Sequence, residues 1–163
     1  FQAFVSIYNF RYSKLEKPIV FKGNRPNILF EDAWLSGFID AEGSFHVYFY
    51  KRSYKVQIRF KVGQKSDKEL CRNIWSLFRG SKSASVQFFK KHDFYEFRLD
   101  SIKGVALLFP YLEQFPLKTQ KKESYKRWKI IHQKLVDKRH LQEQKRQELI
   151  LEGQKINHFI ETK

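Results

Sequence analysis

The sequence contains no methionine, one cysteine, four prolines and seven glycines among its 163 residues. The single Cys71 excludes an internal disulfide framework and any zinc site built from several cysteines, and we expect it to pack as a small apolar side chain. No apolar run approaches the roughly 20 residues that cross a bilayer, and the N-terminus lacks the charged and apolar regions of a signal peptide. Because even position 1 is Phe, we expect the chain to be part of a longer translated product.

Acidic residues are scarce relative to basic ones. Asp and Glu number 17 against 32 Lys and Arg, so the formal net charge at pH 7 is +15. Such an excess favours a polyanionic partner, either nucleic acid or an anionic membrane surface. Aromatic residues make up 17% of the chain, which is enough to build a core and excludes a disordered basic tail. At this length we expect one folded domain with appendages.

The stretch 34–45, WLSGFIDAEGSF, predicts a short helix that ends on an acid. Ala33, Gly37 and Ala41 recur every four residues and form a stripe with almost no side chain, against which another helix can pack very closely. Gly43 then ends the helical spacing, so Glu42 is left at the helix end just before a strand begins. The alternative is an ordinary buried helix with a C-terminal acid.

Hydrophobic periodicity organises the rest of the chain. We expect residues 1–30 to be an N-terminal extension or linker, residues 31–138 the main domain, and residues 139–163 a basic, weakly packed helical extension. The pattern predicts helices over 31–41, from the N-cap Ser66 to about 78, over 101–114 and over 119–138, and strands over 44–51, 54–62, 83–89 and 94–100. This order predicts an α+β fold in which helices cover one face of a four-stranded antiparallel sheet and leave the other face free.

The free face of this sheet is a candidate surface for nucleic acid. An antiparallel ribbon fits the major groove of duplex DNA, where side chains of one pleat reach base edges while Lys and Arg hold phosphates. The candidate binding residues are His46, Tyr48, Lys55, Gln57, Arg59, Lys61, Ser85, Gln87 and Arg98. The alternative is a solvated strand face, but the net charge and the lack of acids at the outward positions of 54–62 favour binding.

Glu42 is the acid best placed to bind a metal ion. Mg²⁺ takes one or two carboxylates and completes its shell with water and substrate phosphate, so a single Glu in this chain forms an incomplete site. If the small-residue stripe packs against an equivalent helix, two such acids meet and could hold Mg²⁺ between the strands of a duplex. That arrangement supports metal-assisted attack of water on a phosphodiester, with nearby lysines stabilising the developing charge.

The nine residues 35–43, LSGFIDAEG, closely resemble the motif of the LAGLIDADG homing endonucleases and their maturase relatives. The similarity extends from about residue 31 to residue 138 and includes the segments 63–65 and 115–118. It implies an αββαββα fold whose saddle-shaped sheet grips DNA, with the motif helix as the interface between two half-sites through Ala33, Gly37 and Ala41. Ser36 replaces the usual Ala and Glu42 the consensus Asp, and neither change suggests an inactive site.

The resemblance also implies roles for individual residues. Glu42 would be the active-site acid, and the carbonyl of Ala41 would also face the metal. Gln64 matches a polar residue near the metal-bound waters, Lys118 a lysine near the scissile phosphates, and Lys68, less closely, a further basic position.

Two functions remain open at this point. The first is a site-specific, Mg²⁺-dependent DNA endonuclease that binds a long duplex target. The second is a LAGLIDADG-derived RNA-binding protein, either a group I intron maturase or a non-catalytic component of an organellar ribosome or other ribonucleoprotein. In either case the resemblance implies an organellar protein, mitochondrial before chloroplast. Its second motif helix would come from a homodimer partner or from a missing N-terminal half, of which we favour the latter.

Overall fold

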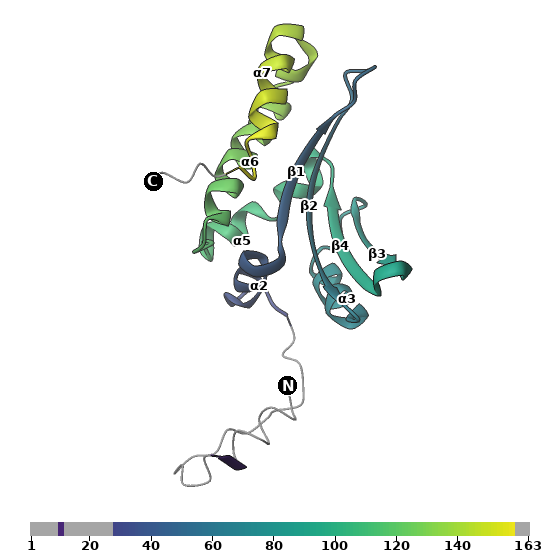
Figure 1. The fold of residues 1–163 in the computed structure, drawn as a ribbon. Helices are drawn as coiled ribbons and strands as arrows, with labels where there is room; N and C mark the ends of the chain where they lie inside the picture. Colours follow the sequence, from purple (N-terminus) through teal and green to yellow (C-terminus); the bar gives the residue numbers. More distant parts are fainter. Residues whose placement is uncertain (1–9, 12–27, 159–163) are drawn as a thin grey trace.

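The computed structural model describes residues 10–11 and 28–158, so the predicted N-terminal extension lies almost entirely outside the described residues. From residue 28 onward the order is helix, two strands, helix, two strands and a series of helices (Figure 1). The elements are α2 (Trp34–Glu42), β1 (Ser44–Phe49), β2 (Val56–Lys65), α3 (Lys68–Leu77), β3 (Ala84–Phe89), η1 (Lys90–His92), β4 (Phe94–Asp100), α4 (Ile102–Ala106), α5 (Phe109–Gln114), α6 (Lys121–Val136), η2 (Arg139–Leu141) and α7 (Glu143–Gln154). None of the helices in these described parts is long and apolar enough to cross a membrane.

The four strands form one antiparallel sheet in the order β1-β2-β4-β3, which confirms the predicted α+β fold. One face of the sheet is hydrophobic and buried, and its residues on the two central strands are Ile58, Phe60, Val62, Phe97 and Leu99. Helices pack on this face, and Figure 1 shows α5, α6 and α7 together on one side of the sheet. Trp128 of α6 is fully buried there, with its ring centroid 5.0 Å from that of Phe45.

The helix predicted over 101–114 is wrong in one respect, because the structure divides it into α4 and α5. Pro110 lies in the first turn of α5. Proline has no N–H to donate and its ring clashes with the preceding turn, so it is tolerated at a helix start but not in a helix interior. Ser101 caps α4, since its side chain accepts a hydrogen bond from the Gly104 N–H at 3.1 Å.

The prediction that Ser66 is the N-cap of α3 is also wrong. Asp67 caps α3, because its carboxylate accepts a hydrogen bond from the Leu70 N–H at 3.0 Å. Ser66 has the left-handed backbone value φ 56°, and its hydroxyl donates to Asp93 in the turn between β3 and β4. It therefore belongs to the turn between β2 and α3 rather than to the helix.

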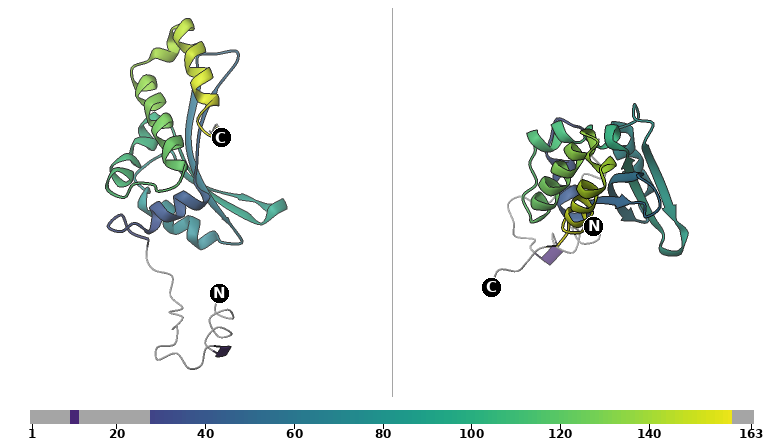
Figure 2. Two further views of the ribbon diagram at one scale, coloured as in Figure 1. Left: turned by 60° about the vertical axis from the view of Figure 1, so that its left-hand side comes forward. Right: turned by 90° about the horizontal axis from the view of Figure 1, so that it is seen from above.

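The C-terminal segment is part of the core, so the expectation of weak packing is wrong. Leu149 and Ile156 are each 1% exposed and belong to the main hydrophobic cluster. The views in Figures 1 and 2 place α7 alongside α6 and the β1–β2 hairpin. Asn157, just beyond α7, donates its side-chain N–H to the Phe45 carbonyl at 3.1 Å. The division of the chain into a main domain over 31–138 and an extension over 139–163 stays a prediction.

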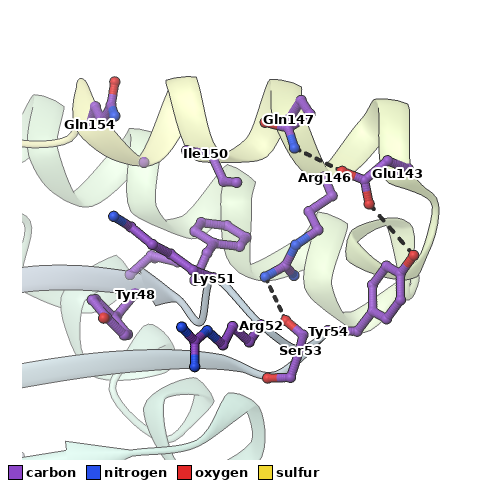
Figure 3. Close-up of a pocket in the computed structure, with 13 residues that line it drawn as sticks. Tyr48, Lys51, Arg52, Ser53, Tyr54, Glu143, Arg146, Gln147, Ile150 and Gln154 are labelled. Atoms are coloured by element: carbon purple, nitrogen blue, oxygen red, sulfur yellow. Dashed lines mark hydrogen bonds between the residues drawn. The ribbon is translucent and has the colours of Figure 1, made fainter.

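Arg146 joins α7 to the turn of the β1–β2 hairpin (Figure 3). Its Nη2 donates to the carbonyls of Tyr50 and Ser53, each at 2.9 Å. The guanidinium also lies 5.4 Å from the Phe49 ring centroid and 5.6 Å from that of Tyr54. A hollow of about 660 Å³ remains between the hairpin and α7. The buried Arg146 therefore connects α7 to the turn of the β1–β2 hairpin.

Candidate functional site

The end of α2 presents Glu42 at the surface. Glu42 is the last helical residue and is exposed, and Gly43 follows with extended backbone at φ −70°. A Cβ atom at position 43 would lie 2.7 Å from both the Cγ2 and the carbonyl oxygen of Ile39. Glycine is thus required here by close approach rather than by a left-handed conformation. The chain can turn from α2 directly into β1 and leave the carboxylate in solvent.

Asp40 fastens the segment between α5 and α6 to the end of α2. Its carboxylate accepts hydrogen bonds from the Lys118 N–H at 2.6 Å, the Thr119 N–H at 3.3 Å and the Thr119 hydroxyl at 2.7 Å. The backbone of residues 118–119 therefore lies against the motif helix. The Lys118 side chain itself is exposed.

Lys121, which sequence reasoning missed, is the lysine that reaches the helix end. Its Nζ donates to the Ala41 carbonyl at 3.1 Å. Burial lowers the pKa of Lys121, while the charges of Asp40 and Glu42 raise it in part. The structure therefore brings an ammonium group beside Glu42. The signal that could have found it is the position of Lys121, three residues beyond Lys118 and first in α6.

The other two predicted catalytic residues lie near one end of β2. Because Ser44 pairs with Lys61, β2 continues past the start of β1, and Gln64 lies in that continuation opposite Tyr95. Gln64 is half-buried, whereas Lys68 is exposed in the first turn of α3. Since α2 contacts β2, Gln64 lies at the end of the sheet that adjoins the motif helix.

The predicted binding residues share the outer face of the sheet with one exception. The register pairs Tyr48 with Gln57, His46 with Arg59, Lys61 with Arg98, Ser85 with Arg98, and Gln87 with Glu96. Lys55 lies outside the strands, because β2 begins at Val56, and is exposed in the hairpin turn. The prediction that 54–62 is one continuous strand is therefore wrong at its start.

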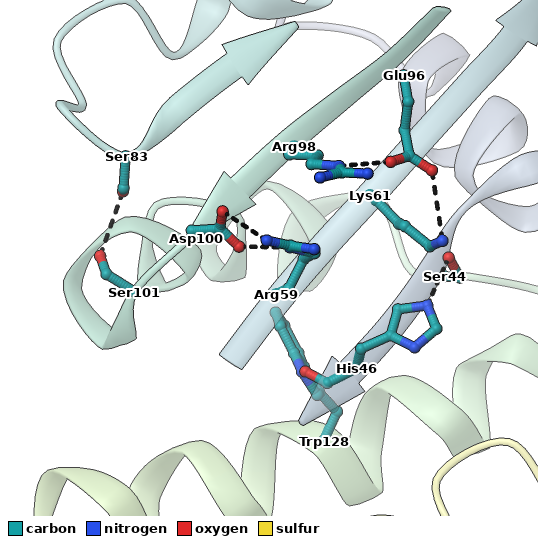
Figure 4. Close-up of polar contacts among 10 residues, drawn as sticks. All are labelled: Ser44, His46, Arg59, Lys61, Ser83, Glu96, Arg98, Asp100, Ser101 and Trp128. Carbon is teal, nitrogen blue, oxygen red and sulfur yellow. Dashed lines mark hydrogen bonds and ion pairs between the residues drawn. The ribbon is translucent and has the colours of Figure 1, made fainter. Parts of the chain in front are cut away.

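Acids from β4 pair with the cations of the outer face (Figure 4). Arg59 donates from Nε and Nη2 to the two carboxylate oxygens of Asp100 at 2.6 and 3.1 Å. Glu96 accepts from Arg98 Nε at 2.5 Å and lies 3.3 Å from Lys61 Nζ. Sequence alternation could not show these pairs, since they depend on the register between β2 and β4.

His46 lies beside these pairs on β1. Its Nε2 is 3.0 Å from the Ser44 hydroxyl. Burial lowers the pKa of His46, and the charges of Lys61 and Arg59 lower it further, against a smaller opposing effect of Glu96. Each of the larger effects disfavours the protonated imidazole.

The oxygen donors at the end of α2 fit part of a Mg²⁺ site. A carboxylate and a backbone carbonyl are the hard ligands that Mg²⁺ prefers. Glu42 is exposed and can supply the carboxylate. The Ala41 carbonyl, in contrast, accepts a hydrogen bond from the Lys121 ammonium. Among the described residues no cluster of three or more His, Cys, Asp or Glu could hold a metal ion. The fit is therefore partial, and a Mg²⁺ site at this helix end would need further ligands.

A family model described as LAGLIDADG endonuclease matches residues 35–132. This chain belongs to the LAGLIDADG endonuclease family. Its curated relatives include the probable intron-encoded endonuclease 4 of Neurospora crassa, which is 28% identical over 144 residues that cover 86% of this chain and 25% of the relative. Another is an uncharacterized cox1 intron-2 37.2 kDa protein of Schizosaccharomyces pombe, 26% identical over 82% of this chain and 40% of the relative. This LAGLIDADG chain thus spans well under half the length of these relatives.

Solved LAGLIDADG structures share the fold. The I-LtrWI homing endonuclease bound to target DNA superimposes with a TM-score of 0.72 at 28% identity, over 93% of this chain and 51% of that chain. The homing endonuclease I-TnaI superimposes with a TM-score of 0.70 at 21% identity, over 82% of this chain and 91% of that chain, and supports the fold alone. The same fold therefore occurs both as half of a longer chain and as nearly a whole chain.

Proposed function

We propose that this chain supplies one half of a site-specific DNA endonuclease that binds duplex DNA on the outer face of its sheet. The observation that carries the proposal is the exposed Glu42 carboxylate at the end of α2, with the Lys121 ammonium on the neighbouring carbonyl. I-LtrWI, which shares this fold, is described as bound to target DNA. The endonuclease names of the curated relatives favour this function over the RNA-binding alternative.

Glu42 and the Ala41 carbonyl would hold Mg²⁺ in the active complex, provided that Lys121 releases the carbonyl. When bound, the metal ion activates water and offsets the charge that develops on a phosphodiester. Lys121 would then turn to a phosphate oxygen, where an ammonium stabilises the same developing charge. Gln64 and Lys68 remain candidates for orienting water and neutralising phosphate.

The small-residue stripe would meet the second half of the enzyme. Ala33, Gly37 and Ala41 are exposed, and a Cβ atom at Gly37 would have no neighbour within 4 Å among the described residues. Nothing in this part of the chain requires so small a residue there, whereas close packing of a second motif helix does. That helix would come from a second copy or from another part of a longer chain, and it would bring the second acid.

A plasmid-nicking assay tests the proposal. The complete protein, incubated with Mg²⁺ and a supercoiled plasmid that carries the intron-less host site, should cut it, whereas Glu42→Gln should bind the site and leave it uncut. Removal of Mg²⁺ by chelation should abolish cutting and spare binding. Absence of Mg²⁺-dependent cutting by the unaltered protein would refute the endonuclease proposal.

A matched pair of lysine variants identifies the catalytic lysine. Lys121→Met should lower the cleavage rate by about 100-fold or more, which is the scale on which loss of one electrostatic donor acts. Lys118→Met should have a smaller effect, because the segment is held through the Lys118 backbone rather than its side chain. A larger loss in Lys118→Met would instead support the role expected from the motif alignment.

RNA binding and location can be checked on the same preparation. RNA that stays bound through a high-salt wash would support the RNA-binding alternative, and its absence would count against it. The cox1 intron in the name of the S. pombe relative favours an organellar protein, mitochondrial before chloroplast.

A further inference from the structure

We propose that Arg59, held by Asp100, recognises a guanine in the major groove near the cleavage site. This inference rests on the proposed DNA-binding function of the outer face. Arg59 lies on the central strand β2, between His46 of β1 and Asp100 of β4. Its side chain and that of Asp100 are 24% and 29% exposed, so the pair is neither buried nor free in solvent.

The ion pair leaves one edge of the guanidinium available. Arginine has five N–H donors, and Asp100 accepts one from Nε and one from Nη2 of Arg59. Two donors on Nη1 and one on Nη2 remain. One donor from each nitrogen points along the end of the group, which is the pair that meets O6 and N7 of guanine. Asp100 therefore binds the Nε/Nη2 side of the guanidinium and leaves the Nη1/Nη2 end available for guanine.

The same contact fixes the direction of that open edge. The two hydrogen bonds to Asp100 restrict the rotation of the guanidinium, and the same contact raises the pKa of Arg59. A restrained donor pair loses less side-chain entropy on binding than a free arginine does. An adenine at this position presents an N–H donor where guanine presents the acceptor O6. The restrained guanidinium therefore discriminates between the two purines.

The neighbouring cations of the face are less suited to this role. Arg98 is only 14% exposed, shares Glu96 with Lys61, and lies 5.3 Å from the Phe89 ring centroid. Lys61 carries a single ammonium and has no paired donors in a fixed plane. Within residues 28–158, Arg59 is thus the arginine of the outer face that combines a two-bond acid contact with an exposed edge.

The position of Arg59 predicts where the guanine lies. Arg59 pairs with His46, which is four residues beyond Glu42, so the chain from Glu42 to His46 spans at most about 14 Å. Successive base pairs rise by about 3.4 Å. The guanine should therefore lie within about four base pairs of the phosphate next to Glu42, in the inner part of the half-site.

Selection from a randomised duplex library tests the assignment. The complete protein should enrich a site with one invariant G·C pair in this inner region. Arg59→Lys and Asp100→Asn should lose the preference at that pair by about tenfold or more and keep the preferences elsewhere. Arg79→Lys, an exposed change in the turn after α3, serves as the matched control and should reproduce the original profile.

A chemical probe separates base recognition from a folding effect. Replacing the selected guanine by 7-deazaguanine removes N7 and should weaken binding of the unaltered protein, whereas Arg59→Lys should bind both duplexes equally. If the protein enriches a site but Arg59→Lys keeps the full preference, this inference is overturned and the proposed function stands. If the protein enriches no duplex, both fail together.

Discussion

Leu149→Ala should destabilise the protein strongly, although Leu149 lies in the C-terminal segment beyond the family match. Leu149 is 1% exposed and belongs to the main hydrophobic cluster, where α7 packs on α6 and β1. Truncation of a buried Leu removes its apolar contacts and leaves a cavity, which costs about 2–5 kcal/mol. Folded domains are stable by only about 5–15 kcal/mol, so the loss should be obvious.

Leu151→Ala is the matched control for this prediction. Leu151 lies two residues away on the same helix but is 57% exposed. The two substitutions change helix propensity equally, so burial is what distinguishes them. We expect Leu151→Ala to change the free energy of unfolding by less than about 0.5 kcal/mol. Urea unfolding followed by circular dichroism, with a common slope for the variants, measures the difference. Equal and small effects would refute the docking of α7.

Three further predictions concern single residues. Gly37→Leu should fold normally and yet lose association with the second motif helix and cleavage, as measured by sedimentation and nicking, whereas Gly80→Leu, also without neighbours within 4 Å, should keep both. His46 has a lowered pKa in the folded state, so the unfolded state binds more protons below pH ~6.5 and stability should fall as the pH drops from 7.5 to 5.5; the decline should be shallower in His46→Gln. Cys71 is fully buried, its Sγ donates to the Tyr95 carbonyl at 3.3 Å and burial raises its pKa, so iodoacetamide should label it in urea and not in the native protein.

The sheet could be predicted from the sequence because one face of each central strand is apolar. Strict alternation in β2 places Ile58, Phe60 and Val62 on the buried face and the polar residues on the other. A shift of one residue would expose the whole apolar set, so the pattern specifies the register as well as the strand. The residues of the outer face could thus be named before their neighbours were known.

The C-terminal helix was harder to predict because its inward positions are not all apolar. Arg146, Leu149, Gly153 and Ile156 recur at helical spacing, but only two of the four are apolar. Arg146 is buried because it bonds to carbonyls of the hairpin turn, and a Cβ atom at Gly153 would lie 3.4 Å from the Phe49 ring. Both contacts are made with the β1–β2 hairpin, which is distant in the sequence.

The candidate site also depends on contacts between segments that are distant in the sequence. The motif located Glu42, but Lys121 reaches the helix end only because Asp40 fixes the segment at Lys118 and Thr119. Likewise, the role of Asp100 depends on the β2–β4 register. Sequence patterns predict which face a residue shares, whereas contacts between distant segments decide which of several similar residues reaches a site.

The cations of the outer sheet face and of the β3–β4 turn divide into two groups, and this division yields a final prediction about the proposed DNA binding. Arg59, Lys61 and Arg98 in the centre of the sheet are paired with acids. Lys90 and Lys91 in the turn between β3 and β4 are exposed and form no ion pair with another described residue. Phosphate contacts position a protein on DNA, whereas base contacts specify the sequence. We therefore expect the turn lysines to contact phosphates and the paired arginine to read a base.

Changing both turn lysines to Gln should weaken binding of every duplex similarly. The slope of log affinity against log salt concentration should become shallower by about 1.8, since each phosphate contact contributes about 0.9. The selected sequence should not change, because the acids that hold Arg59 and Arg98 are intact. Arg59→Lys should show the reverse, with a nearly unchanged salt slope and an altered base preference. A sequence change in the turn variant, or an unchanged salt slope, would contradict the division between phosphate-contacting turns and a base-reading centre.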